Sequence, residues 1–155
     1  MKFLVTEECG RLARWLRLMG YDAALGTAQS LSALYRQAYN EGRVVVTRNR
    51  RIGASCLFRV VQLGSDELDG QLLQLLRDLQ LPREDAGWFT RCDVCNVTLQ
   101  PIEKPHVKSR VAPYVYDTQQ AFYVCPACQR VYWAATHWQR ARRFLDRVRK
   151  EVRRA

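Results

Sequence analysis

Two Cys-x-x-Cys pairs are the feature that most limits how this 155-residue chain can fold. The pairs are Cys92 with Cys95 and Cys125 with Cys128, and 29 residues lie between Cys95 and Cys125. Two such pairs can close a tetrahedral site in which each pair chelates one metal ion from its own turn. Four sulfur ligands leave no open position for water, so we expect a structural zinc ion that holds together a segment too small for a large core.

Other interpretations of the cysteines stay open. The pairs could remain reduced without a metal, or they could hold an iron–sulfur cluster. A thioredoxin-like redox motif fits less well because the chain has two Cys-x-x-Cys pairs rather than one. The first residues, MKFLVTEECG, lack the apolar core of a secretory signal, and no apolar run reaches the ~18 residues that span a bilayer. We therefore expect a cytoplasmic protein with no membrane contact, in which paired cysteines indicate metal binding before disulfides.

The N-terminal part alternates apolar runs with helical patterns. The expected strands are KFLV from Lys2, RVVVT from Arg43 and FRVVQLG from Phe58. Apolar residues at helical spacing predict helices over residues 10–20, 31–40 and 66–79, and Ser30 can cap the second. Strands that alternate with helices predict an α/β domain with a parallel sheet flanked by helices.

The pattern changes at LPREDAG, residues 81–87, where Pro and charged residues interrupt the apolar spacing. We expect the chain to divide there into an α/β domain over residues 1–81 and a zinc ribbon with a basic C-terminal helix over 88–155. Within the second unit, AFYVCPACQRVYWA at 121–134 predicts a strand, a tight turn and a strand. The apolar stripe of the last helix, which includes Leu145 and Val148, would pack against the ribbon.

Positive charge gathers in the second unit. Residues 1–90 hold 12 Lys and Arg against 10 Asp and Glu, whereas residues 91–155 hold 13 against 5. This imbalance favours an anionic partner, most simply nucleic acid, because neutralising phosphates releases counterions. The alternative is a solvated basic helix face that needs no partner.

Polar residues follow each expected strand, and ligands of open parallel sheets bind at the carboxyl ends of the strands. A nuclease that uses divalent metals needs several carboxylates there, because Mg²⁺ and Mn²⁺ prefer oxygen ligands. Thr6 and Asn49, both uncharged, stand nearest two of the strand ends, while Glu7, Asp22 and Asp66 supply acids nearby. For each single acid, a role in a helix cap or a turn is the alternative.

Several stretches resemble one known family over nearly the whole chain. They are GRLARWLRLMGYD at 10–22, EGRVVVTRNR at 41–50, RCDVCN at 91–96, RVAPYVYDT at 110–118, FYVCPACQRVYW at 122–133 and THWQR at 136–140. With these stretches in this order, the chain resembles the Mut-seven C-terminal ribonuclease family, whose members have a PIN-like nuclease domain followed by a zinc ribbon. The resemblance implies a metal-binding acidic cluster that cuts RNA, assisted by the ribbon and the tail.

The chain departs from the pattern that the resemblance implies at two positions. The first strand should end in VDE and the second in TRD, but this chain has Val5-Thr6-Glu7 and Thr47-Arg48-Asn49. Losing two anionic ligands should lower affinity for Mg²⁺ or Mn²⁺ severely, because that affinity follows ligand charge. Glu7, Asp22 and Asp66 remain as candidates to hold one ion.

Three functional hypotheses follow. The first is an RNA-binding protein, with tRNA or ribosomal RNA among the ligands, whose ribonuclease centre is degraded. The second is a working Mg²⁺- or Mn²⁺-dependent ribonuclease on tRNA or other structured or single-stranded RNA. The third is a non-catalytic adaptor for a protein or a ribonucleoprotein. The residues expected to contact RNA are Arg11, Arg14, Arg48, Arg50, Arg140, Arg143, Arg147 and Lys150.

Overall fold

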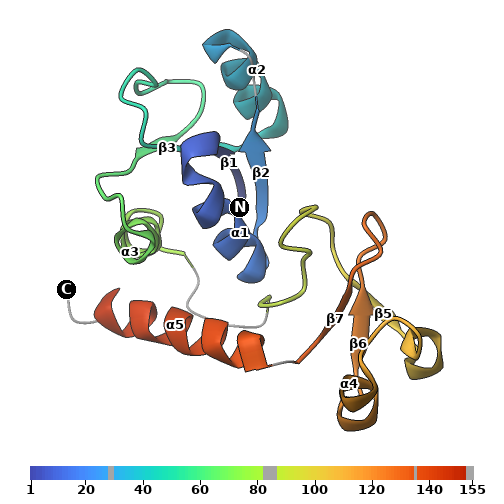
Figure 1. Ribbon diagram of the computed structural model, residues 1–155. Helices are drawn as coiled ribbons and strands as arrows, with labels where there is room; N and C mark the ends of the chain where they lie inside the picture. Colours follow the sequence, from blue (N-terminus) through green and yellow to red (C-terminus); the bar gives the residue numbers. More distant parts are fainter. Residues whose placement is uncertain (28–29, 82–86, 135, 153–155) are drawn as a thin grey trace.

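A four-stranded parallel sheet forms the N-terminal part of the protein (Figure 1). The structure is a computed structural model, which describes residues 1–27, 30–81, 87–134 and 136–152. The strands stand in the order β2-β1-β3-β4, and every neighbouring pair runs parallel. Helices flank the sheet, so the expected α/β class is confirmed. The strands are β1 (Lys2–Thr6), β2 (Asp22–Gly26), β3 (Val44–Thr47) and β4 (Val60–Gln62).

Alternating side chains along the strands supply two apolar cores on opposite faces of the sheet. Phe3 and Val5 belong to a large cluster with α1 (Gly10–Leu18), α3 (Leu68–Asp78) and α5 (Thr136–Val152). Leu4, between them in sequence, joins a smaller cluster with α2 (Leu31–Glu41). The period of two, with both faces of the sheet buried, therefore explains why the three consecutive residues Phe3, Leu4 and Val5 are all apolar.

The helix boundaries follow local chemistry with small differences from expectation. Ser30 caps α2 as predicted, because its Oγ accepts a hydrogen bond from the backbone N–H of Ala33 at 3.2 Å. Helix α3 begins at Leu68, two residues later than the expected start, because Glu67 is still extended. Strand β2 was not predicted, since its sequence DAALG carries little β preference and pairs only with β1.

The second part contains a three-stranded antiparallel ribbon in the order β5-β6-β7. The expected strand, turn and strand are confirmed as β6 (Phe122–Val124) and β7 (Val131–Trp133). Strand β5 (Gln100–Ile102), the 3-10 helix η2 (Lys104–Val107) and α4 (Pro113–Thr118) precede them and were not predicted. Each of these three elements is too short to produce a clear hydrophobic period.

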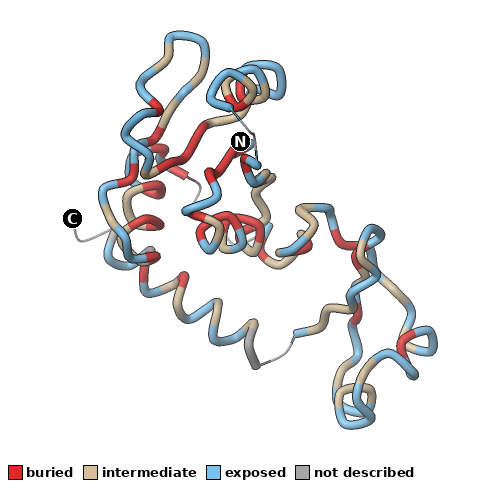
Figure 2. Tube along the Cα trace, turned by 45° about the horizontal axis from the view of Figure 1, so that its top comes forward, coloured by how far each residue is buried: buried red, intermediate tan, exposed pale blue. Residues whose placement is uncertain are grey.

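Helix α5 packs differently from the expected arrangement. Leu145 and Val148 are buried in the same core as Phe3, and the ring of Phe144 lies 4.4 Å from that of Trp15 on α1. The helix thus covers the α/β domain rather than the ribbon (Figure 1). Apart from Leu145 and Val148, the positions of α5 whose burial is described are intermediate or exposed, and these two colours prevail along it in Figure 2. The large core extends past the expected boundary at 81–87, of which 82–86 lie outside the described residues, while a smaller cluster around Cys92, Leu99 and Cys125 belongs to the second part alone. Neither α5 nor any other helix in the described part of the chain is long and apolar enough to cross a membrane.

The beginning of the second part contacts the residues at the end of α1 closely through the backbone. Gly20 has φ +87°, and a Cβ atom at this position would lie 2.1 Å from the carbonyl oxygen of Gly87. The N–H of Phe89 also donates to the carbonyl of Leu18 at 2.7 Å. Only glycine combines this backbone angle with this approach, so Gly20 fixes where the second part joins the first.

Candidate functional site

A shallow hollow of about 270 Å³ lies at the carboxyl ends of β1 and β3. Its polar walls come from the end of β1, from the following 3-10 helix η1 (Glu7–Cys9) and from the residues after β3. Glu7 and Asn49, both exposed, border it together with Thr6 and Glu8. The hollow therefore stands where a parallel sheet normally binds its ligand.

Glu8 is the central acid of this region, although it was not among the predicted catalytic residues. Its Oε1 accepts hydrogen bonds from Thr6 Oγ1 at 2.6 Å, Thr47 Oγ1 at 3.0 Å and the backbone N–H of Arg48 at 3.2 Å. Burial of Glu8 opposes ionisation, but these hydrogen bonds outweigh it and hold the pKa of Glu8 below its ordinary value. Glu8 thus ties the ends of β1 and β3 together as a carboxylate.

The two threonines that bind Glu8 are themselves buried. Thr6 is 5% exposed and Thr47 is fully buried, so each hydroxyl needs a partner inside the protein. One threonine follows the first expected strand, another ends the second, and an acid stands two residues after the first of these threonines; this combination is the sequence signal that could have identified Glu8. That signal became specific only when β1 and β3 proved to be neighbours.

Asn49 stabilises the turn that follows β3. Its Oδ1 accepts a hydrogen bond from the N–H of Arg51 at 3.0 Å, and its own N–H donates to Thr47 Oγ1 at 3.0 Å. An aspartate could accept the same hydrogen bond from Arg51, because its carboxylate oxygen occupies the equivalent position. Asn49 therefore keeps the turn while removing one negative charge from the border of the hollow.

The structure does not bring Asp22 together with Glu7. In the parallel register Lys2 pairs with Asp22 and Thr6 pairs with Gly26. Asp22 therefore lies at the amino end of β2, whereas the hollow lies at the carboxyl ends of the strands. Its carboxylate binds the Arg43 guanidinium at 2.7 Å and accepts a hydrogen bond from Asn96 Nδ2 at 2.7 Å. Burial opposes ionisation, but the hydrogen bonds from Arg43 and Asn96 outweigh it and lower the pKa of Asp22.

Asp66 lies in the loop before α3 and forms an ion pair with Arg48. The Asp66 side chain is 76% exposed, so water screens this pair strongly. The three predicted acids, Glu7, Asp22 and Asp66, therefore do not form one cluster. In the part of the chain that the structure describes, the four cysteines are the one group of three or more potential metal-binding side chains.

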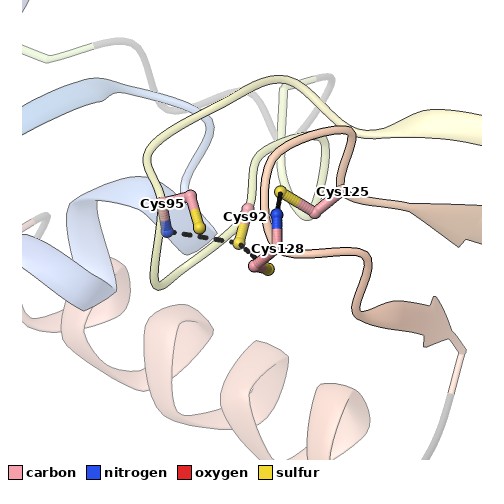
Figure 3. A group of neighbouring side chains, drawn as sticks. All are labelled: Cys92, Cys95, Cys125 and Cys128. Carbon is pink, nitrogen blue, oxygen red and sulfur yellow. Dashed lines mark hydrogen bonds between the residues drawn. The ribbon is translucent and has the colours of Figure 1, made fainter.

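Those four cysteines converge at the junction of two loops (Figure 3). All four sulfur atoms lie within 4.8 Å of one another, and the Cys92 and Cys128 sulfurs are 3.9 Å apart. A tetrahedral ion with metal–sulfur distances of about 2.3 Å needs sulfurs about 3.8 Å apart. The N–H of Cys95 donates to the Cys92 sulfur, and the N–H of Cys128 donates to the Cys125 sulfur. This arrangement could hold a metal such as zinc.

The protonation of the cysteines is uneven. Burial of Cys92 opposes ionisation, but the Tyr132 hydroxyl at 3.0 Å and nearby backbone N–H groups outweigh it and lower the pKa of Cys92 to about 7. The hydrogen bond with Cys128 is the main cause that raises the pKa of Cys95 to about 12. A metal ion binds thiolates, so it would displace the protons that these thiols hold.

The first cysteine turn docks onto α1 through arginines. Arg17 is 8% exposed and donates to the carbonyl oxygens of Ala23, Asp93 and Val94 at 2.8 to 2.9 Å. Arg14, a predicted RNA contact, forms an ion pair with Asp93 at 2.7 Å. The arginine face of α1 therefore serves partly to hold the cysteine site against the sheet domain.

The other predicted RNA-contacting residues lie on two surfaces. One is near the strand ends, where Arg48 pairs with exposed Asp66. The other is α5, where Arg147 forms an ion pair with Asp69 at 3.2 Å. The remaining predicted contacts are exposed: Arg11 and Arg50 in the first domain, and Arg140, Arg143 and Lys150 on α5.

These features define a class of protein with a parallel-sheet domain, a polar hollow at the strand ends and a four-cysteine ribbon docked beside α1. The family model of the Mut7-C RNAse domain matches residues 1–145. The chain therefore belongs to the Mut7-C RNAse domain family, as its motifs indicated, and membership supports a nuclease-like function related to RNA. Searches of curated proteins and of solved structures found no match.

Proposed function

We propose that this protein binds RNA and that its metal-dependent ribonuclease centre is degraded. The observation that carries this proposal is the chemistry of the hollow at the strand ends. Thr6 and Asn49 stand where the family resemblance implies aspartates, and both make hydrogen bonds that maintain the fold. Two fewer anionic ligands should leave too little charge to hold catalytic Mg²⁺ or Mn²⁺.

The remaining acids do not replace the missing ones. One oxygen of Glu8 already accepts three hydrogen bonds, and Asp66 is paired with Arg48. Asp22 lies at the amino end of β2, in contact with Arg43. Glu7 is therefore left with Glu8 as its acidic neighbour at the hollow, which favours the degraded centre over a working ribonuclease built from Glu7, Asp22 and Asp66.

Charge supports RNA as the partner. The chain carries a formal net charge of +10, and most of it lies beyond residue 90. Exposed arginines and Lys150 on α5 present part of that charge to solvent. We further propose that the four cysteines hold a structural zinc ion, which fixes the ribbon without taking part in chemistry.

The test compares RNA binding and RNA cleavage for the zinc-loaded full chain. The wild type should retain cellular RNA, with affinity that falls steeply between about 50 and about 200 mM salt, and should leave the RNA intact with Mn²⁺. The double variant Thr6→Asp/Asn49→Asp should gain Mn²⁺-dependent cleavage. In the matched control Thr6→Asn/Asn49→Asp, the asparagine at position 6 has the shape of an aspartate without its negative charge. This control should remain inactive.

Two outcomes would contradict the proposal. Cleavage by the wild type at the rate of the double variant would show that the site works with its present residues. Failure of the wild type to retain any RNA at low salt would instead favour the adaptor hypothesis, in which the basic surface binds a protein partner.

A further inference from the structure

A basic, aromatic cavity of about 580 Å³ lies between α1 and the ribbon, away from the hollow at the strand ends. The residues that matter to its chemistry are Arg14, Asp93, Arg110, Arg130, Tyr132 and Trp133. Three positive groups therefore face one acid. The volume lies within the range of about 300 to 1,000 Å³ that is typical of small-molecule sites.

The single acid of the cavity is already neutralised by its neighbours. Asp93 Oδ2 accepts from Arg14 Nη2 at 2.7 Å, and Asp93 Oδ1 accepts from the Tyr132 hydroxyl at 3.0 Å. Neither Arg110 nor Arg130 forms an ion pair with a residue in the described part of the chain. These two guanidinium groups therefore give the cavity its uncompensated positive charge, which suits a phosphate group.

The walls of the cavity are held by backbone contacts. The Arg110 guanidinium donates to the carbonyl oxygen of Gln129, which places it on the turn between β6 and β7. The N–H of Cys125 donates to the carbonyl of Arg130 at 3.0 Å, and the N–H of Gln129 donates to the carbonyl of Cys125 at 2.9 Å. The turn that carries two cysteines thus also sets the positions of the two arginines.

Aromatic surface completes the cavity. Trp133 is half-buried at the end of β7, and its ring also lies 6.5 Å from that of Phe122. A half-buried indole beside guanidinium groups offers a face on which an unpaired base can stack. Carboxylates of an acidic peptide could pair with the arginines, but they would make no use of this ring.

We propose that this cavity binds one nucleotide of single-stranded RNA, with its base against Trp133 and its phosphate between Arg110 and Arg130. The proposal rests on the proposed RNA-binding function and adds where an unpaired base is recognised. A base inside a duplex is stacked on its neighbours, so double-stranded RNA should not enter the cavity. The strand-end hollow and α5 would contact only the phosphate backbone.

The test measures fluorescence anisotropy of labelled RNA with the zinc-loaded full chain. The probes are a single strand of about 12 nucleotides and a hairpin of the same composition whose strands are joined by a non-nucleotide linker, so that the hairpin has no unpaired loop bases; single-strand sites span about 4 to 16 nucleotides. Arg110→Gln/Arg130→Gln should weaken single-strand binding about tenfold or more and hairpin binding less than about threefold. The matched control Arg36→Gln/Arg77→Gln removes the same charge from exposed positions of α2 and α3, and should weaken both probes by less than about threefold.

Trp133 provides a second readout. Trp133→Leu should weaken single-strand binding about fivefold or more, whereas Trp133→Phe should keep most of the affinity because a ring remains. The chain has four tryptophans, so the RNA-induced quenching of tryptophan fluorescence should largely disappear in Trp133→Phe if Trp133 is the stacking residue. Circular dichroism and bound zinc verify that each variant is folded.

The possible failures are distinguishable. If the wild type binds RNA and Arg110→Gln/Arg130→Gln binds single strands equally well, the cavity proposal is overturned while RNA binding stands. Equal losses for the single strand and the hairpin would also overturn it, since they would indicate phosphate contact alone. If the wild type binds neither probe at low salt, the proposed function falls and the cavity proposal falls with it.

Discussion

Replacement of Asp22 by alanine should destabilise the protein without removing an RNA-cleaving group. The Asp22 carboxylate accepts hydrogen bonds from Arg43 at 2.7 and 3.2 Å and from Asn96 at 2.7 Å. The exposed fraction is 24% for the Asp22 side chain and 10% for the Arg43 side chain. The substitution would therefore leave a mostly buried guanidinium without its main carboxylate. It would also remove one of the two hydrogen bonds that join β2 to Asn96, because the backbone N–H of Ala23 would still donate to Asn96 Oδ1 at 3.0 Å.

The magnitude follows from these contacts. Removing one partner of a buried ion pair costs about 3–5 kcal/mol, and a hydrogen bond to a charged group contributes about 1.5–3 kcal/mol. Arg43 would still bind Glu41 and the carbonyl oxygen of Phe3, and water reaches part of the site. We therefore expect Asp22→Ala to lower the free energy of unfolding by about 2–3 kcal/mol at neutral pH.

Urea unfolding of the zinc-saturated protein, followed by circular dichroism, measures this change. Asp66→Ala is the matched control: its carboxylate is also paired with an arginine but is 76% exposed, so the loss should stay within about 0.5 kcal/mol. A loss below about 0.5 kcal/mol for Asp22→Ala would refute the structural role of Asp22. If Asp22→Ala abolished the Mn²⁺-dependent cleavage expected of Thr6→Asp/Asn49→Asp at unchanged stability, Asp22 would instead return as a candidate catalytic acid.

The pH dependence gives an independent check on the same residue. Arg43 and Asn96 lower the pKa of Asp22 in the folded protein despite its burial. A depressed folded pKa stabilises the protein above the unfolded value of about 3.9, and this contribution is lost as pH falls through the folded pKa. The difference in stability between the wild type and Asp22→Ala should therefore shrink as the solution is acidified below about pH 4.

Three further perturbations test other parts of the fold. Gly20→Ala should cost about 1–3 kcal/mol from the backbone angle alone, plus the clash with Gly87, and thermal unfolding should show a lower Tm. Leu145→Ala should cost about 2–5 kcal/mol in urea unfolding, since Leu145 is fully buried, whereas exposed Lys150→Ala should change stability by less than about 0.5 kcal/mol. Removal of the proposed zinc ion with a chelator, or Cys125→Ser, should unfold the ribbon while leaving the helical signal of the sheet domain; an unchanged ribbon in the chelated protein would contradict a structural metal.

Local patterns were enough to predict much of the fold. The β-branched run at Val44–Thr47, the helical spacing of Leu12 and Leu16 and the cap at Ser30 each depend on near neighbours in sequence. Strand β2 escaped prediction because Ala23 and Ala24 have little β preference, and the strand forms only because the edge of β1 is available to pair. Local patterns were also insufficient for α5. Its apolar stripe was clear from the sequence, but the sequence did not show that this stripe packs on the α/β domain.

The candidate sites divide in the same way. The sequence by itself determined the four-cysteine cluster, because the Cys-x-x-Cys spacing places two sulfurs on each turn, and it determined the family and the absence of aspartates at Thr6 and Asn49. Only the tertiary structure decided which acids meet. The parallel register places Asp22 at the amino end of β2, away from the carboxyl ends of the strands. Because β1 and β3 are neighbours, Glu8 contacts both Thr6 and Thr47. Such encounters depend on contacts between residues distant along the chain, which local spacing does not encode.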